Sequence, residues 1–261
     1  MKKLLDLSKR KKFVLTSIIL ALGLLITQII KTDHRYEAIF ILSLCSLLFS
    51  LWCLWEGLSG ITFITVLLLP PLYTAGVGLF YFLLPVRWLT RLPVAFFYAF
   101  GMYSLLLTEN IFSVAAIRTI QLLRAAHAVG FLLTLITAFF LYDTILSFRF
   151  PFWINFFLSF LATFPLMIQG FWSVKLEDYF SKPALLYSIL LSFGIAEVAL
   201  FLSFWPVTVT VGSLFLTSLL YVLLGLFQHH LDERLFRRTA AEYIFVGVIV
   251  FITVFLTTSW G

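Results

Sequence analysis

The chain has 261 residues, of which 62% are hydrophobic and 11% are charged, and its mean hydropathy is +1.08. A soluble domain is nearer half apolar and a quarter charged, so this composition excludes an ordinary soluble protein. The formal net charge is +6, but six of the eighteen Lys and Arg lie within the first twelve residues, directly before an apolar run. That distribution is typical of a membrane-orientation signal and argues against nucleic-acid binding.

Nine apolar stretches follow, each of roughly 18–26 residues, which is enough to cross a hydrocarbon core about 30 Å thick. They predict helices at residues 13–30, 38–55, 61–85, 92–117, 125–148, 151–174, 183–205, 207–228 and 243–260. The stretches lack the alternation of apolar and polar residues that a transmembrane barrel strand needs. The sequence therefore predicts an all-α, polytopic transmembrane helix bundle. Residues 1–261 are expected to form a single integral membrane domain, with residues 1–12 as a basic cytoplasmic tail.

The eight prolines agree with these boundaries. Five stand at the edges of predicted helices, where a missing N–H costs little: Pro85, Pro93, Pro151, Pro183 and Pro206. Pro70, Pro71 and Pro165 lie inside predicted helices, and we expect them to kink or break those helices.

The distribution of Lys and Arg predicts the orientation of the chain. With nine spans and the basic tail in the cytoplasm, the cytoplasmic segments carry thirteen of these residues and the outer segments carry five. If Pro70 and Pro71 instead formed a re-entrant turn that left eight spans, the two sides would carry nine each. The positive-inside bias therefore favours nine spans, with the N-terminus cytoplasmic and the C-terminus outside.

Residues 61–148 and 151–228 share a layout that could be an internal repeat. Each set begins with a helix interrupted by proline, continues with a helix that a proline opens and that carries one glutamate, and closes with a third helix. Three spans is an odd number, so the second copy would be inverted in the membrane. Inverted repeats with broken helices are typical of secondary transporters. The alternative is coincidence among hydrophobic helices that contain scattered prolines.

The strongest candidates for a substrate- or ion-binding site are Glu109 and Glu197, because each is a carboxyl group within a predicted span that contains no Lys or Arg. At a helical rise of about 1.5 Å, Glu109 lies roughly 13 Å from the cytoplasmic end of its span and Glu197 about 12 Å from the outer end of its own. Such carboxyls suit proton coupling or cation binding. The structural alternative is a protonated carboxyl that donates to a helix carbonyl. Asn110, Asn155 and Gln169 are further candidate polar contacts.

Two residues at the start of the fifth predicted span form a candidate proton relay. His127 lies three residues into that span, and Arg124 precedes it by one turn. The pair could carry protons from the cytoplasm toward Glu109. The alternative is an interfacial histidine beside small residues that allow close helix contact. Near the other end of the same span, Asp143 with Arg149 close by is interpreted as an interfacial cap.

No metal or cofactor site is predicted. His229 and His230 have suitable side chains for a metal, but adjacent residues on a helix point about 100° apart and no third cluster completes a site. Nucleophilic triads, glycine-rich phosphate loops and CxxC pairs are absent from the sequence.

The run ENIFSVAAIRTIQLLRAAHAVGFLLTL, residues 109–135, resembles a stretch in multi-pass bacterial membrane proteins that carry no assigned activity. The resemblance covers about a tenth of the chain and includes no catalytic motif. It implies a bacterial cell (plasma) membrane and nothing about a substrate.

Three classes of function remain open. A small secondary transporter would bind a proton or cation at Glu109 and Glu197, between the fourth and seventh predicted helices, with the third and sixth lining the path. A membrane scaffold or assembly protein would place both glutamates at protein contacts, without a water-accessible cavity. An enzyme on lipid-linked substrates would need clustered charges at one membrane face, for which residues 229–242 with Arg118 and Arg124 are the candidate. The predicted partners are the lipid bilayer and anionic lipids at the basic tail.

Overall fold

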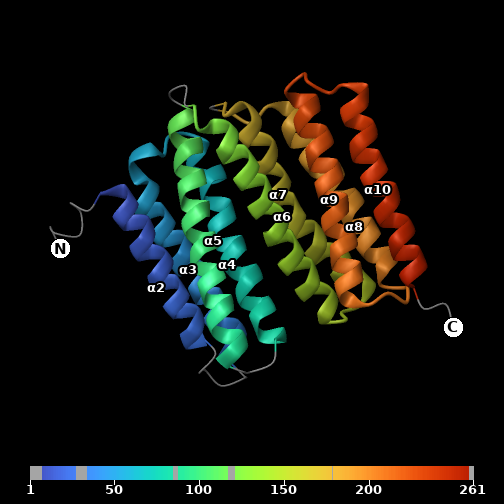
Figure 1. The fold of residues 1–261 in the computed structure, drawn as a ribbon, viewed down its shortest axis with the longest axis horizontal. Helices are drawn as coiled ribbons and strands as arrows, with labels where there is room; N and C mark the ends of the chain where they lie inside the picture. The colour runs from blue at the N-terminus through green and yellow to red at the C-terminus, as the bar shows by residue number, and fades with distance from the viewer. Residues whose placement is uncertain (1–7, 28–33, 85–87, 117–120, 178, 259–261) are drawn as a thin grey trace. The chain divides into compact units, whose positions relative to one another are not determined.

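The computed structural model describes residues 8–27, 34–84, 88–116, 121–177 and 179–258 (Figure 1). Every regular element within these ranges is helical. The long helices are α2 (Lys9–Thr27), α3 (Arg35–Leu54), α4 (Thr62–Leu83), α5 (Trp88–Ala115), α6 (Leu123–Ser147), α7 (Phe152–Lys175), α8 (Lys182–Leu202), α9 (Val209–Leu231) and α10 (Arg237–Thr257). A 3-10 turn, η2 (Trp55–Gly57), follows α3 directly.

The predicted all-α class is confirmed. Eight helices, α3 to α10, are long and apolar enough to cross a membrane by length and composition, which favours a helical membrane protein. The remaining helix, α2, begins with four consecutive basic residues and has a shorter apolar part. Those four belong to the predicted tail, residues 1–12, which is therefore helical from Lys9 onward. A ninth span and the orientation of the termini stay predictions.

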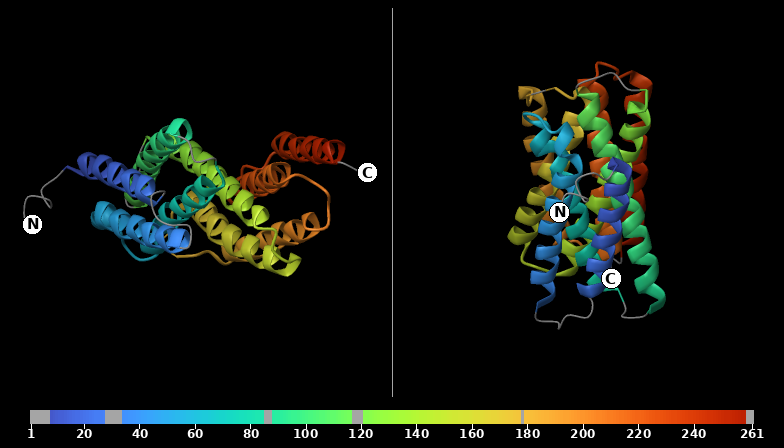
Figure 2. Two further views of the ribbon diagram at one scale, coloured as in Figure 1. Left: turned by 90° about the horizontal axis from the view of Figure 1, so that it is seen from below. Right: turned by 90° about the vertical axis from the view of Figure 1, so that its left-hand side faces the viewer.

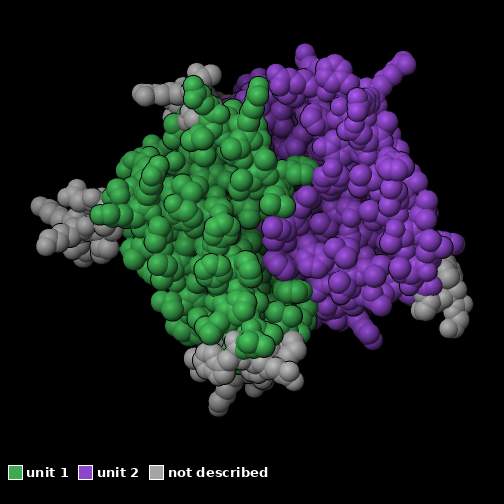
Figure 3. All heavy atoms as spheres, viewed as in Figure 1, with its two compact units in different colours: residues 1–133 green, residues 134–261 purple. Residues whose placement is uncertain are grey.

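The chain divides into two compact units, residues 1–133 and 134–261, and the division falls inside α6 (Figure 3). In unit 1, α2 packs against α3 and α5, and α4 packs against the same two helices (Figure 2). In unit 2, α7 packs against α8 and α9, and α10 lies beside α9. The division does not follow the predicted repeat, residues 61–148 and 151–228, because α6 contributes to both units. The repeat and the single membrane domain both stay predictions.

The interior prolines do not break their helices, and the alternative, that they kink them, stays a prediction. α4 runs without interruption through Pro70 and Pro71, and α7 runs through Pro165. The alternative of a re-entrant turn at Pro70 and Pro71, which the distribution of Lys and Arg disfavours, is absent, because α4 is continuous there. Membrane helices tolerate proline because nearby hydroxyls and small local adjustments compensate the missing backbone hydrogen bonds. The Thr74 hydroxyl donates to the carbonyl of Pro70 at 2.9 Å, one turn earlier in the same helix.

The predictions for the edge prolines are partly confirmed. Pro151 is the N-cap residue of α7, and Pro183 lies in the first turn of α8. Pro93 was expected to open a helix but lies inside α5, because that helix begins earlier, at Trp88. Pro206 does not open α9, because it stands in the middle of a tight turn in which the Val207 N–H donates to the Trp205 carbonyl, and the helix begins only at Val209. Pro85 lies outside the described residues.

A tyrosine cluster fixes α4 against α5. The rings of Tyr73 and Tyr98 stack with their centroids 5.5 Å apart, and the hydroxyl groups of Tyr98 and Thr74 are 2.9 Å apart. The Tyr73 hydroxyl donates to the carbonyl of Phe97. This arrangement requires glycine at position 101, since a Cβ atom built at Gly101 would overlap the Tyr73 hydroxyl. Both tyrosines are buried, so their rings have little room to move aside.

We expect Gly101→Ala to lower the free energy of unfolding by about 1–3 kcal/mol, because the added methyl group displaces a stacked, hydrogen-bonded tyrosine. Gly194→Ala is the matched control, since nothing lies within 4 Å of a Cβ atom built there. That control should be neutral or stabilising by up to about 1 kcal/mol, the usual gain of alanine over glycine in a helix. Thermal unfolding in one detergent, followed by tryptophan fluorescence, measures both variants. Equal losses would show that Gly101 is not closely packed.

The predicted orientation can be tested with single cysteines in a chain whose two free cysteines, Cys45 and Cys53, are replaced by serine. Phe204, between α8 and α9, is exposed and predicted to lie outside; Glu233, between α9 and α10, is exposed and predicted to lie in the cytoplasm. A membrane-impermeant maleimide should label Phe204→Cys in intact cells and label Glu233→Cys only after permeabilisation. The reverse pattern would invert the orientation.

Candidate functional site

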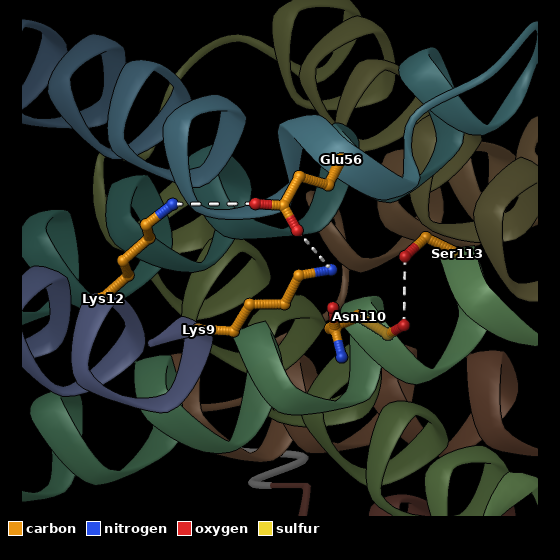
Figure 4. Close-up of polar contacts among 5 residues, drawn as sticks. All are labelled: Lys9, Lys12, Glu56, Asn110 and Ser113. Carbon is orange, nitrogen blue, oxygen red and sulfur yellow. Dashed lines mark hydrogen bonds and ion pairs between the residues drawn. The ribbon is translucent and has the colours of Figure 1, made fainter. Parts of the chain in front are cut away.

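One polar cluster lies where the start of α2 meets η2 (Figure 4). The Glu56 carboxylate lies between two amino groups of α2, with Nζ of Lys9 at 3.1 Å and Nζ of Lys12 at 3.9 Å. The Lys12 side chain is mostly buried, and its Nζ lies 5.5 Å from the centroid of the Trp52 ring. Glu56 itself is 61% exposed, so each pair is worth at most about 1 kcal/mol. The cluster therefore positions the basic end of α2 more than it stabilises the fold.

The C-terminal end of α5 approaches the same cluster. A Cβ atom built at Gly57 would lie 2.7 Å from Oγ of Ser113, so η2 and α5 are in close contact. The Ser113 hydroxyl donates to the backbone carbonyl of Asn110 at 3.0 Å (Figure 4). The predicted candidate Asn110 is thus half-buried near Lys9 and Glu56.

Glu109 is one residue from this contact and is fully enclosed, with 0% of its surface exposed. The polar residues Thr108 and Ser113, on the same helix, are also buried. The Thr108 hydroxyl is used by its own helix, since it donates to the carbonyl of Ser104 at 2.9 Å. α5 thus carries a buried carboxyl group about 9 Å from its C-terminal end at the usual helical rise.

The start of α6 packs on this part of α5. The His127 ring is half-buried against Phe112, with the ring centroids 5.5 Å apart, and Phe112 lies one turn beyond Glu109. Gly130 permits the contact, because a Cβ atom there would approach Phe112 and Thr108 at 3.2 Å. The structure therefore brings His127 and the Glu109 segment together.

The other relay candidate, Arg124, is exposed at the start of α6. Arg118, which the sequence placed in a charged cluster with Arg124 and residues 229–242, lies outside the described residues. In the described part of that polar run, Arg234 pairs with Asp232 at 3.4 Å and Arg238 with Glu242 at 3.3 Å. These charges are exposed and largely neutralise one another.

Glu197 has different surroundings from Glu109. It lies on α8 in unit 2 and is exposed, on a side of the helix that also exposes Leu190, Phe193 and Phe201. Spacings of three and four residues place these side chains on one face of a helix. Glu109 is therefore enclosed, whereas Glu197 lies on an apolar face.

Unit 2 contains a cavity of about 450 Å³ where α6 and α8 end and α7 and α9 begin. The predicted candidate Asn155 lines it and is only 3% exposed. Its Nδ2 donates to the carbonyl of Phe150 at 3.2 Å and to the Ser203 hydroxyl at 3.0 Å. The residues that give the lining its polar and aromatic character are Arg149, Phe150, Asn155, Ser203, Trp205 and Thr208.

Sequence analysis missed this cavity. Its polar residues each stand at the end of a predicted helix, where each one alone is read as an interfacial residue. One feature of the sequence could have indicated the cavity: the helix ends that carry these polar residues are all predicted to lie at the same membrane face.

Two further residues lie apart from the cavity. Gln169 is buried in α7, fourteen residues after Asn155, which corresponds to roughly 21 Å along the helix, so the two do not share a site. The interpretation of Asp143 as an interfacial cap paired with Arg149 is wrong. Asp143 is buried and accepts a hydrogen bond from Ser213 of α9 at 3.0 Å, because the end of α6 is covered by α9. No ion pair joins Asp143 to Arg149 in the described structure.

The model of one protein family, described as Protein of unknown function (DUF5656), matches residues 53–257. The chain belongs to this family. The match confirms the predicted resemblance to proteins without an assigned activity, and it spans the end of α3 to the end of α10, including Glu109 and the cavity. No curated protein and no solved structure matches the chain.

The contact between Asp143 and Ser213 gives a stability prediction for this DUF5656 member. We expect Ser213→Ala to lower the free energy of unfolding by about 1–3 kcal/mol, because a buried carboxyl group loses its donor. Ser218→Ala is the matched control on the same helix, since that exposed hydroxyl donates only to the Leu214 carbonyl of its own turn. Thermal unfolding in detergent should show a lower midpoint for Ser213→Ala alone. Indistinguishable midpoints would mean that the hydrogen bond contributes nothing.

Proposed function

We propose that this protein is a small secondary transporter of the cell membrane, in which Glu109 binds the coupled proton or cation. The observation that carries the proposal is the complete burial of a carboxyl group in a helix of membrane-spanning length. Ionisable groups at such depth are costly, and in membrane proteins they mark proton and ion paths.

His127 and Arg124 support a route to that carboxyl. Arg124 is exposed at the start of α6, and His127, one turn further along, contacts the α5 turn that follows Glu109. An imidazole group can both accept and donate a proton, so His127 is suited to pass protons between a membrane face and a buried acid. Glu197 takes no coupling role in this proposal, because it is exposed on an apolar face.

The cavity in unit 2 supports the transporter over a scaffold. Its volume of about 450 Å³ falls within the range of small-molecule sites, roughly 300–1,000 Å³, and its lining combines apolar side chains with a few polar groups. A scaffold that only packs against partner helices needs no such space.

One observation favours the scaffold as a second candidate. α10 packs mainly against α9, and Val254 is its single buried residue in the described range. Nearly the whole apolar surface of α10 is therefore available to lipid or to a partner helix. A scaffold would assemble through this surface and would move no solute.

Transport measurements with matched substitutions separate the two candidates. The purified chain would be reconstituted in liposomes and exposed, under an imposed pH or sodium gradient, to a panel of amino acids, organic acids, sugars, nucleosides and amines. We expect at least one solute to give a gradient-dependent current that Glu109→Gln reduces at least about tenfold, since glutamine has the shape of glutamate but no titratable proton. Glu197→Gln, which makes the same chemical change on an exposed face, should leave the current unchanged. A silent panel, or equal currents in the wild type and Glu109→Gln, contradicts the proposal.

A further inference from the structure

The amide group of Asn155 has a defined orientation at the cavity. Its nitrogen donates to the carbonyl of Phe150, and a carbonyl oxygen can only accept, so Nδ2 must face Phe150 and Oδ1 must face away. Oδ1 is buried, and no described residue donates to it. A buried acceptor without a donor costs free energy, so a donor supplied from outside the protein would stabilise Oδ1 of Asn155.

The same cavity is positively charged. Arg149 lines it, is exposed and forms no ion pair with any described residue. None of the lining residues is acidic. A ligand that carries negative charge would therefore meet an uncompensated guanidinium group.

Two helix N-termini add to this charge. α7 begins at Phe152, between the lining residues Phe150 and Asn155, and α9 begins at the lining residue Val209. The first N–H groups of a helix lack partners within the helix, and they carry partial positive charge. Thr208 is the N-cap residue of α9, but its side chain makes no capping bond, so its hydroxyl is available at the cavity.

The remaining lining is apolar and includes Leu146, Leu202 and Val207. An alkyl or acyl part of a ligand can pack there while its polar part meets Arg149 and Asn155. The four helix ends also place the cavity at one end of the membrane-spanning helices of unit 2.

We propose that this cavity binds an anionic amphiphilic group that carries its own hydrogen-bond donor. A phosphate would lie against Arg149 and the N-termini of α7 and α9, and an ammonium or hydroxyl group next to the phosphate would donate to Oδ1 of Asn155. This chemistry is found in the headgroups of phosphatidylethanolamine and phosphatidylglycerol, and in the free solutes phosphoethanolamine and glycerol 3-phosphate. The inference does not rest on transport and holds whether or not Glu109 couples to an ion.

Phosphatidylcholine supplies the matched chemical control, since its headgroup has the same charges as that of phosphatidylethanolamine but no N–H or O–H donor. Binding of short-chain phosphatidylethanolamine and phosphatidylcholine to the purified full chain in detergent would be measured by microscale thermophoresis. We expect the wild type to bind phosphatidylethanolamine at least about tenfold more tightly, because a buried acceptor rejects an analogue that lacks its donor. Asn155→Leu should bring the ratio to about one.

Arg149→Gln tests the anionic part and is expected to fold, because Arg149 is exposed and bonds to no described side chain. This substitution should lower the affinity for both lipids by about tenfold and leave the preference for phosphatidylethanolamine unchanged, since the guanidinium group contacts the phosphate that both lipids share. Arg237→Gln, which removes an exposed cation away from the cavity, is the matched control and should change nothing.

The source of the ligand follows from competition. Displacement of the lipid by phosphoethanolamine or glycerol 3-phosphate, but not by phosphocholine, supports a free solute. Tight lipid binding without displacement by any of the three supports a membrane headgroup. Equal affinity for the ethanolamine and choline lipids in the wild type, or unchanged affinity in Arg149→Gln, would overturn the proposal even if all variants remain folded.

Discussion

The cost of leaving a polar group without a hydrogen-bond partner in apolar surroundings constrains this structure more widely than any single contact. Most serine and threonine hydroxyls in its helices donate to a carbonyl one turn earlier, as Ser188 does to Ala184 at 2.8 Å. Those hydroxyl groups therefore need no hydrogen-bond partner on a neighbouring helix. The few polar contacts between helices, such as Tyr142 with Thr163 at 2.7 Å and Asp143 with Ser213, then fix how helices pack within a unit.

The side chains of Glu109 and Asn155 need more hydrogen-bond partners than their own helix turns can supply. A hydroxyl has one proton to donate, whereas a carboxyl group or a carboxamide has two polar atoms to accommodate. Asn155 engages its nitrogen twice and leaves its oxygen facing away from those bonds, beside a cavity. Glu109 is enclosed, with buried Thr108 and Ser113 on the same helix. Both candidate sites therefore arise from the same constraint, one enclosed by protein and the other open to a ligand.

The positions of the helices could be predicted from the sequence, but which face of each helix is exposed and which is buried could not. Apolar length alone located the ends of every long helix to within six residues, because a membrane span is defined by its length. The contrast between Glu109 and Glu197 could not be foreseen, since both stand in helices that are apolar on all sides and show no polar face to indicate solvent or core. The cavity was hidden for another reason: its lining comes from four helix ends spread over residues 146–209, and each end alone looks interfacial.

Some of the basic residues that the sequence predicts to contact anionic lipids instead contact a carboxylate of the protein. In the described part of the tail, Lys9 and Lys12 face Glu56, so two of the four basic residues that open α2 are engaged by the protein, while Arg10 and Lys11 remain exposed. Arg149 has no such acidic neighbour among the described residues, and it stands beside two helix N-termini and a buried acceptor. Exposed lysines on a helix attract any anionic surface, whereas a cation with a fixed acceptor beside it distinguishes one headgroup from another. Selective recognition of an anion is therefore expected at the cavity rather than at the tail.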